Sequence, residues 1–178
     1  RHPKTLLAAA ILAATGAPQV AFTQDSGADI EEVVVTGARG RPRTVSDSPV
    51  PVDVFSADEI QAISHTDTNN VLQTLIPSFN VARQPISDGA TMIRPASLRG
   101  LPTDKTLVLV NGKRRHRAAL VAIGGSGTQG PDMATVPASA LKNIEVLRDG
   151  ASAQYGSDAM AGVINFILND NSEGGSLT

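Results

Sequence analysis

The chain has no cysteine and no tryptophan, only one tyrosine, and aromatic residues make up 3% of its 178 residues. The absence of cysteine excludes disulfides, thiolate metal sites, cysteine nucleophiles and the lipid-bearing cysteine of a bacterial lipoprotein. The scarcity of aromatics means that the core must be built from Val, Ile, Leu and Ala with few large anchors. At 41% hydrophobic residues the chain is predicted to fold, but with only marginal stability on its own.

An excess of positive charge is also missing. Fifteen Lys and Arg against seventeen Asp and Glu give a net charge of -2, which lacks the positive field that nucleic-acid binding requires. His2, His65 and His116 lie far apart, and none has another His or a carboxylate at metal-ligand spacing. We therefore expect no nucleic-acid partner, no metal site and no cofactor.

The first residues have the pattern of an export signal. Arg1, His2 and Lys4 precede an apolar run over residues 6–14, and Gly16-Ala17-Pro18 follows. The run is too short to span a bilayer, and the alternative is a buried core helix. The basic flank and the helix-breaking residues favour a signal peptide over residues 1–23, with its cleavage site undetermined. Because the chain opens on Arg, whether its natural start lies upstream stays open.

Residues 31–37 form a short strand-like segment between two linkers. Residues 24–30 are small, polar or acidic, and residues 38–48 mix Gly, Pro, Arg and Ser, so both are predicted to be mobile. Val33-Val34-Val35 is a run of β-branched residues with high strand propensity. No neighbouring strand is predicted, so this segment is expected to need a partner.

The compact part begins at Pro49. Valines alternate over residues 50–54 as in a half-buried strand, and residues 56–59 (Ser-Ala-Asp-Glu) have the form of a capping box before a short helix through Ile63. A second helix is predicted to begin near Thr68 and to end before Pro77. A polar loop is expected over residues 83–90.

The second half of the chain predicts three further strands. Leu107–Val110 is a continuous apolar run, expected to be the central strand and buried on both faces, and Asn111-Gly112 is a favoured turn dipeptide. Residues 114–136 form a long basic and Gly-rich excursion, a helix is expected over residues 139–141, and strands over 143–148 and 162–168. The fold class predicted is α+β, a small mixed sheet with short helices.

Three catalytic signatures in the glycine loop are false positives. Residues 125–130 match the dinucleotide-binding GxGxxG pattern, but Pro131 and Asp132 follow where the phosphate-binding helix must begin. Pro131 also stands where a P-loop needs Lys, and Thr128 stands where a nucleophile elbow needs its second Gly. We therefore expect no enzyme.

Several segments together resemble the plug domain of TonB-dependent outer-membrane receptors. They are Ile144–Gly156 continuing through Ala161–Asn165, Leu98-Arg99-Gly100-Leu101, Leu107–Gly112 and Glu31–Gly37. The resemblance covers most of residues 30–168. It implies a TonB box and linker at 24–48, a plug domain at 49–170, and at 171–178 the start of a β-barrel that is absent here.

The resemblance implies a gate inside the lumen of an outer-membrane barrel, facing the periplasm, with its own barrel as a partner. The TonB box is Glu31, Glu32, Val33, Val34, Val35, Thr36 and Gly37, which would pair edge-on with the periplasmic domain of TonB. The stretch between the leader and Glu31 is too short for the additional periplasmic signalling domain that some relatives carry, so none is expected. Cargo would be a small molecule, most often a ferric siderophore in this family, with cobalamin, haem and sugars as other choices.

The resemblance also assigns site residues. Arg99, Glu145 and Arg148 lie in signatures that seat the plug against charged barrel residues, although ordinary solvation is the alternative. The loops expected to face substrate contain Arg83, Gln84, Asp88, Arg94, Arg114, Arg115, His116 and Arg117. For any single residue of the run 113–117 a solvated face is favoured, whereas the cluster as a whole is a candidate for contact with an anionic ligand or with a surrounding protein wall.

Two other classes of function stay open at this point. A free periplasmic binding module would use Arg114, Arg115 and Arg117 to bind an anionic ligand, and it would be stably folded in isolation. A nucleotide-dependent oxidoreductase would show saturable dinucleotide binding that Gly127→Val abolishes, and we expect none.

Overall fold

The computed structural model describes residues 34–35, 43–44, 51–81, 88–122, 127–149 and 151–170. The signal-peptide prediction for residues 1–23 lies outside these ranges. The strands are β1 (Val34–Val35), β2 (Arg43–Thr44), β3 (Val52–Ser56), β4 (Phe79–Asn80), β5 (Ser97–Leu98), β6 (Thr106–Val110), β7 (Lys113–Arg114), β8 (Leu141–Leu147) and β9 (Gly162–Leu168). The α-helices are α2 (Ala57–Ala62), α3 (Thr68–Leu75) and α4 (Ala151–Tyr155), and the 3-10 turns are η1 (Asp88–Thr91), η2 (Thr103–Lys105), η4 (Ala138–Ala140) and η5 (Ser157–Ala159).

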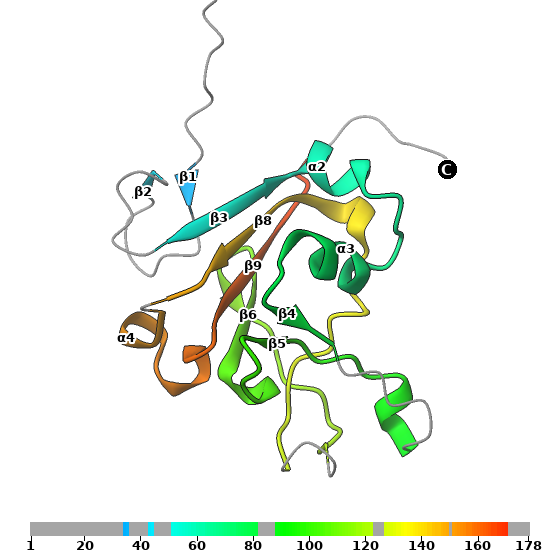
Figure 1. Ribbon diagram of the computed structural model, residues 1–178, viewed down its shortest axis with the longest axis vertical. Helices are drawn as coiled ribbons and strands as arrows, with labels where there is room; N and C mark the ends of the chain where they lie inside the picture. The colour runs from blue at the N-terminus through cyan, green and yellow to red at the C-terminus, as the bar shows by residue number, and fades with distance from the viewer. Residues whose placement is uncertain are drawn as a thin grey trace, which may run out of the picture. The chain divides into compact units, whose positions relative to one another are not determined.

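The main sheet of the described residues has five strands in the order β3-β8-β9-β6-β7 (Figure 1). Its pairs are antiparallel except β6 with β9, which run parallel. The predicted α+β class with a small mixed sheet is confirmed. The prediction that Leu107–Val110 is the central strand is wrong, because β9 occupies the centre and β6 lies beside the two-residue β7. Residues 107–109 are nevertheless buried, as the apolar run indicated.

Helices cover both faces of the sheet. On one face Ile60 of α2 and Val71 and Leu72 of α3 pack with Ile144 and Phe166 in the larger core cluster. A smaller cluster on the other face joins Val52, Leu107, Leu109, Leu147 and Val163 to Ala151 and Ala159. Figure 1 shows α2 and α4 at opposite ends of the long strands β8 and β9. Burial on both faces explains why these strands lack a simple polar alternation.

Both predicted N-terminal helices are confirmed, and so is the capping box predicted for the first of them. Ser56 Oγ accepts a hydrogen bond from Glu59 N at 3.4 Å, and Glu59 Oε2 accepts one from Ser56 N at 2.8 Å, which is the reciprocal pattern of a capping box. Helix α3 ends at Leu75, two residues before Pro77, as the clash of proline with a preceding helical residue requires. No helix in the described ranges is long and apolar enough to cross a membrane.

The capping box predicts a modest loss of stability in the Ser56→Ala variant. Alanine removes the acceptor for Glu59 N, and losses at such caps are about 1 kcal/mol. We expect this decrease in the free energy of unfolding, measured by urea denaturation of the full chain. The matched variant Ser56→Thr keeps a hydroxyl and is expected to lose only a few tenths of a kcal/mol. Equal losses in the two variants would show that the cap contributes nothing.

The Asn111-Gly112 turn between β6 and β7 is confirmed. Both residues have positive φ, +48° and +74°, which the favoured two-residue hairpin turn requires. The turn is also tied to β9: Asn111 N donates to Phe166 O at 2.8 Å, and Leu168 N donates to Asn111 Oδ1 at 2.9 Å. These bonds fix the turn to the centre of the sheet.

Three local predictions need correction. Val34–Val35 does have a strand partner, because β1 pairs antiparallel with Arg43–Thr44 inside the expected linker; the exposed backbone groups of a β-branched run are satisfied by the nearest extended segment. The helix expected over residues 139–141 is the 3-10 turn at 138–140, after which Leu141 enters β8. Helix α4 was not predicted, because five residues carry too little periodicity to indicate a helix.

Candidate functional site

Arg99 lies at the end of β5 with an unusual backbone. Its φ is +56°, a left-handed conformation that non-glycine residues seldom adopt, and Gly100 follows at +71°. Its guanidinium donates to Ala161 O at 3.2 Å through Nε and to Met160 O at 3.0 Å through Nη2, and it pairs with Asp149. The side chain is thus held against the start of β9, while 39% of it stays exposed.

Arg148 follows β8 and pairs with Asp53 of β3, while its main-chain N donates to Pro51 O at 3.3 Å. Its side chain is 46% exposed. Both predicted seating arginines therefore have carboxylate partners inside this chain and a face left for solvent or for another surface. A guanidinium carries five N–H donors, so contact with a second carboxylate is compatible with these pairs.

Glu145 is placed differently from the two arginines. It lies in β8 with no exposed surface, and its Oε2 accepts a hydrogen bond from Asn165 Nδ2 of β9 at 2.9 Å. Asn165, also fully buried, accepts from Gly112 N at 3.0 Å. This burial gives Glu145 no direct access to an outer wall and fits a role in holding β8, β9 and the Asn111-Gly112 turn together. Its seating role stays a prediction.

The basic run after the turn is largely paired. Arg114 Nη1 donates to Asp158 Oδ2 at 2.7 Å, and Arg117 Nη2 donates to Asp158 Oδ1 at 3.1 Å. Arg115 Nη2 donates to Thr135 Oγ1 at 2.6 Å, and His116 is exposed. The three arginines line a shallow hollow that opens to solvent and is also lined by Asp104, Asp158 and Gln129. Two carboxylates therefore offset much of the positive charge expected to attract an anion.

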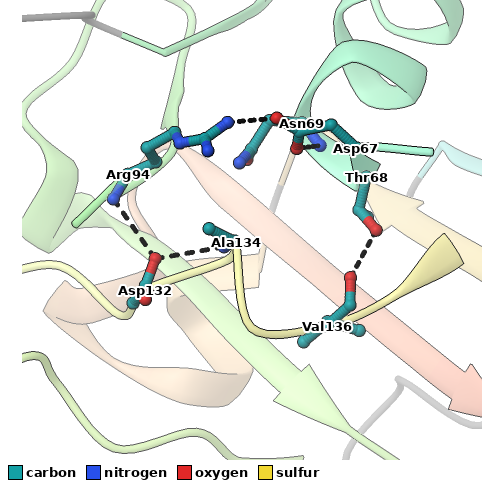
Figure 2. Close-up of polar contacts among 7 residues, drawn as sticks. All are labelled: Asp67, Thr68, Asn69, Arg94, Asp132, Ala134 and Val136. Carbon is teal, nitrogen blue, oxygen red and sulfur yellow. Dashed lines mark hydrogen bonds and ion pairs between the residues drawn. The ribbon is translucent and has the colours of Figure 1, made fainter. Parts of the chain in front are cut away.

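Arg94 belongs to a second polar cluster, at the start of α3 (Figure 2). Its guanidinium pairs with Asp67, and its main-chain N donates to Asp132 Oδ1 at 3.2 Å. The predicted substrate-facing residues thus fall into two places, Arg94 here and the arginines of the basic run beside the hollow. Arg83, Gln84, the side chain of Asp88 and most of Glu31–Gly37 lie outside the described residues.

Within residues 127–137, the part of this segment that the structure describes, the glycine loop does not open a helix. Gly127 has φ +71°, Ala122 and Thr128 form an isolated antiparallel bridge, and the next helical turn after Gly130 is η4. A Cβ at Gly130 would lie 2.6 Å from Pro95 Cβ, so this glycine permits close packing of two segments. The rejection of a dinucleotide site is consistent with this geometry, since that site needs a helix N-terminus.

The acidic partners were missed by sequence reasoning. Asp67 could have been found, because an Asp directly before a predicted helix is an N-cap signal. Asp132, Asp149 and Asp158 are separated from their arginine partners by 38, 50 and 41 or more residues, and no local pattern indicates such pairs.

Comparisons with known proteins agree with this architecture. The family model described as TonB-dependent Receptor Plug Domain matches residues 44–163. The chain is 32% identical over 148 residues to an iron-regulated outer membrane virulence protein of Vibrio cholerae, covering 83% of this chain and 21% of that protein. It is 31% identical over 164 residues to the vitamin B12 transporter BtuB of Photobacterium profundum, covering 92% and 24%.

Solved structures show the same likeness. The ferric enterobactin receptor PfeA of Pseudomonas aeruginosa matches with a TM-score of 0.53 at 29% identity, over 69% of this chain and 18% of that one. The siderophore receptor PirA of Acinetobacter baumannii matches with a TM-score of 0.51 at 29% identity, over 71% and 18%. The chain spans less than a quarter of the length of these relatives. On the match of the family model to residues 44–163, this chain belongs to the plug-domain family of TonB-dependent receptors, a transport family without enzymatic activity.

Proposed function

We propose that this plug is the gate of an outer-membrane receptor for active uptake of a scarce nutrient such as an iron-siderophore complex. TonB would bind Glu31–Gly37 and pull on it, which would loosen the plug and open a path through the barrel. The observation that carries this proposal is that the proposed TonB box lies on the N-terminal side of β3, the edge strand of the main sheet, with only residues 38–51 between them in the chain.

The strand order supports transmission of force. Within the described residues β3 pairs only with β8, so it is the edge strand of the main sheet and the first to be loaded from the N-terminal side. β1 likewise pairs only with β2 among the described strands, which leaves its other edge without a neighbouring strand. An incoming strand of TonB can add to such an edge through main-chain hydrogen bonds.

Seating of the plug is proposed to involve Arg99 and Arg148. Both guanidinium groups are held in place by internal acceptors and keep part of their surface exposed. Pre-positioned arginines lose little conformational entropy on meeting a barrel carboxylate. Glu145 would contribute indirectly, by keeping β8 and β9 in register beneath them.

The cargo is proposed from the relatives. The named relatives include a vitamin B12 transporter as well as siderophore receptors. Two surfaces are proposed to face cargo. They are the hollow beside Arg114 and the loop over residues 83–94.

The test of TonB coupling is a proline in the proposed TonB box. Val34→Pro removes a main-chain N–H donor from β1. Edge-on pairing with TonB would lose one hydrogen bond, and the adjacent hydrogen bonds of the strand pair would be distorted. We expect at least about a tenfold weaker binding of the TonB periplasmic domain to the 178-residue chain, measured by isothermal calorimetry.

Val34→Thr is the matched control, because threonine is also β-branched and keeps the main-chain N–H. We expect its affinity for TonB to stay within about twofold of the unaltered chain. If Val34→Pro binds TonB as well as Val34→Thr does, coupling through this segment is wrong.

A free binding module for an anionic ligand is the alternative, and the hollow lined by three arginines is the observation in its favour. It predicts that the chain alone binds a probe such as citrate and loses it when Arg114, Arg115 and Arg117 are each replaced by Gln. The pairing of two of these arginines with Asp158 argues for weak binding at most.

A further inference from the structure

Three segments that are distant in sequence meet at the start of α3 (Figure 2). Arg94 reaches Asp67 through its guanidinium and Asp132 through its main-chain N. Asp132 Oδ1 also accepts from Ala134 N at 3.0 Å, and Met133 N donates to Arg94 O at 3.4 Å. Arg94 therefore contacts the start of α3 through its side chain and residues 132–134 through its main chain.

The connection between Arg94 and α3 is weak by its nature. Asp67 uses Oδ1 to cap the helix, accepting from Asn69 N at 3.0 Å, and Oδ2 to pair with Arg94. The side chains of Arg94 and Asp67 are 32% and 25% exposed, so water reaches the pair and screens it. Ion pairs in such surroundings contribute little net stability. This pair can therefore open without unfolding the domain.

Asn69 lies in the first turn of α3, where Figure 2 draws it beside Arg94 and Asp67. Its side chain is 1% exposed, yet neither the amide nitrogen nor the amide oxygen has a hydrogen-bond partner. A buried amide without partners is unfavourable, because it has lost its bonds to water and gained none. A displacement of this turn that admits water would satisfy both atoms.

We propose that this junction is a two-state latch. In the closed state Arg94 pairs with Asp67 and the Asn69 amide is buried without partners. In the open state the ion pair is separated, the first turn of α3 has moved, and water hydrates Asn69. Moving this turn also separates the buried Thr68 hydroxyl from Val136 O, to which it donates. Hydration of the two Asn69 polar atoms must therefore offset this bond as well as the weak ion pair for both states to be accessible. Use of the latch as a relay from the cargo-facing segments to α3 rests on the proposed function, whereas the latch itself does not.

The experiment is hydrogen exchange of the 178-residue chain, read by mass spectrometry over residues 92–96 and 132–136. Asp67→Asn keeps a good capping residue but removes the charge that Arg94 needs, so it favours the open state. We expect exchange in both segments to be about tenfold faster, with the amides of β8 and β9 unchanged as the folding reference.

Asn69→Leu tests the other side of the balance. It replaces the amide by an apolar side chain of similar size, so the open state no longer gains free energy from hydrating the amide. Exchange in the same two segments should therefore be about tenfold slower. Asn69→Val serves if leucine does not fit. Gln73→Ala, at an exposed position of the same helix, is the control and should change neither segment.

Opposite signs for the two variants support the latch. Unchanged or faster exchange in both apolar Asn69 variants would overturn it, because a static anchor gains nothing from losing the amide. An equal acceleration of β8 and β9 in Asp67→Asn would also overturn it, since that result describes global destabilisation. None of these outcomes depends on TonB binding, so the latch and the proposed function fail separately.

Discussion

Replacing Gly162 with alanine lowers the free energy of unfolding by about 3 kcal/mol or more. Gly162 begins β9 with φ +137°, a conformation that other residues rarely adopt. An added Cβ would also lie 2.6 Å from Leu147 O and 3.1 Å from Leu98 Cδ1. Leu147 belongs to β8, so its carbonyl cannot move without disturbing the pairing of β8 with β9 at the centre of the sheet.

Gly100→Ala is the control that separates strain from collision. Gly100 also has positive φ, +71°, but nothing lies within 4 Å of an added Cβ. It should lose only the cost of a left-handed residue, about 1–2 kcal/mol. Urea denaturation followed by circular dichroism measures both variants. Equal losses would mean that the close approach at Gly162 is not as the structure has it.

Asn165→Leu is expected to cost about 3 kcal/mol. Asn165 donates to Glu145 and accepts from Gly112 N, and both it and Glu145 are fully buried. Leucine would leave the donor at Gly112 without this acceptor and deprive the Glu145 carboxyl group of a hydrogen bond in a place that water does not reach. Such one-sided losses are more costly than the bond itself is worth.

The second change in a double-mutant cycle should restore stability. Adding Glu145→Leu to Asn165→Leu removes the carboxyl group that the first change deprived of a hydrogen bond, and we expect it to recover about 1–2 kcal/mol. In the otherwise unaltered chain, Glu145→Leu should be destabilising. If the losses of the two single variants simply add in the double variant, Glu145 and Asn165 are not coupled. The buried hydrogen bond between their side chains would then not stabilise the sheet.

Local signals in the sequence were sufficient for the elements with caps or long apolar runs. The capping box at Ser56, the end of α3 before Pro77 and the Asn111-Gly112 turn follow from interactions within a few residues of each other. The strand order does not, because the placing of β9 between β8 and β6 depends on contacts between distant segments. A continuous apolar run indicates burial, and burial is compatible with more than one position in a sheet.

The candidate site was less predictable than the fold. The sequence drew attention to arginines, and the structure supplies their acidic partners from distant segments, as Asp158 does for Arg114 and Arg117. Glu145 is the clearest case. Charged residues are rarely buried fully, so its place inside the sheet could be found only from the partner that Asn165 provides across β8 and β9.

The proposed gate has an edge strand on its N-terminal side and a pair of long strands at its centre. The edge strand β3 follows the proposed TonB box in the chain, whereas the seam of β8 and β9 holds the domain together at its centre. This arrangement fits a domain that must loosen under force from one end without losing its whole sheet.

The most direct test of TonB coupling is hydrogen exchange of the 178-residue chain with and without the TonB periplasmic domain. Main-chain pairing predicts at least about tenfold slower exchange for amides of residues 32–37 in the complex, with those of β9 unchanged. Binding that protects other residues and leaves residues 32–37 unprotected would contradict the account.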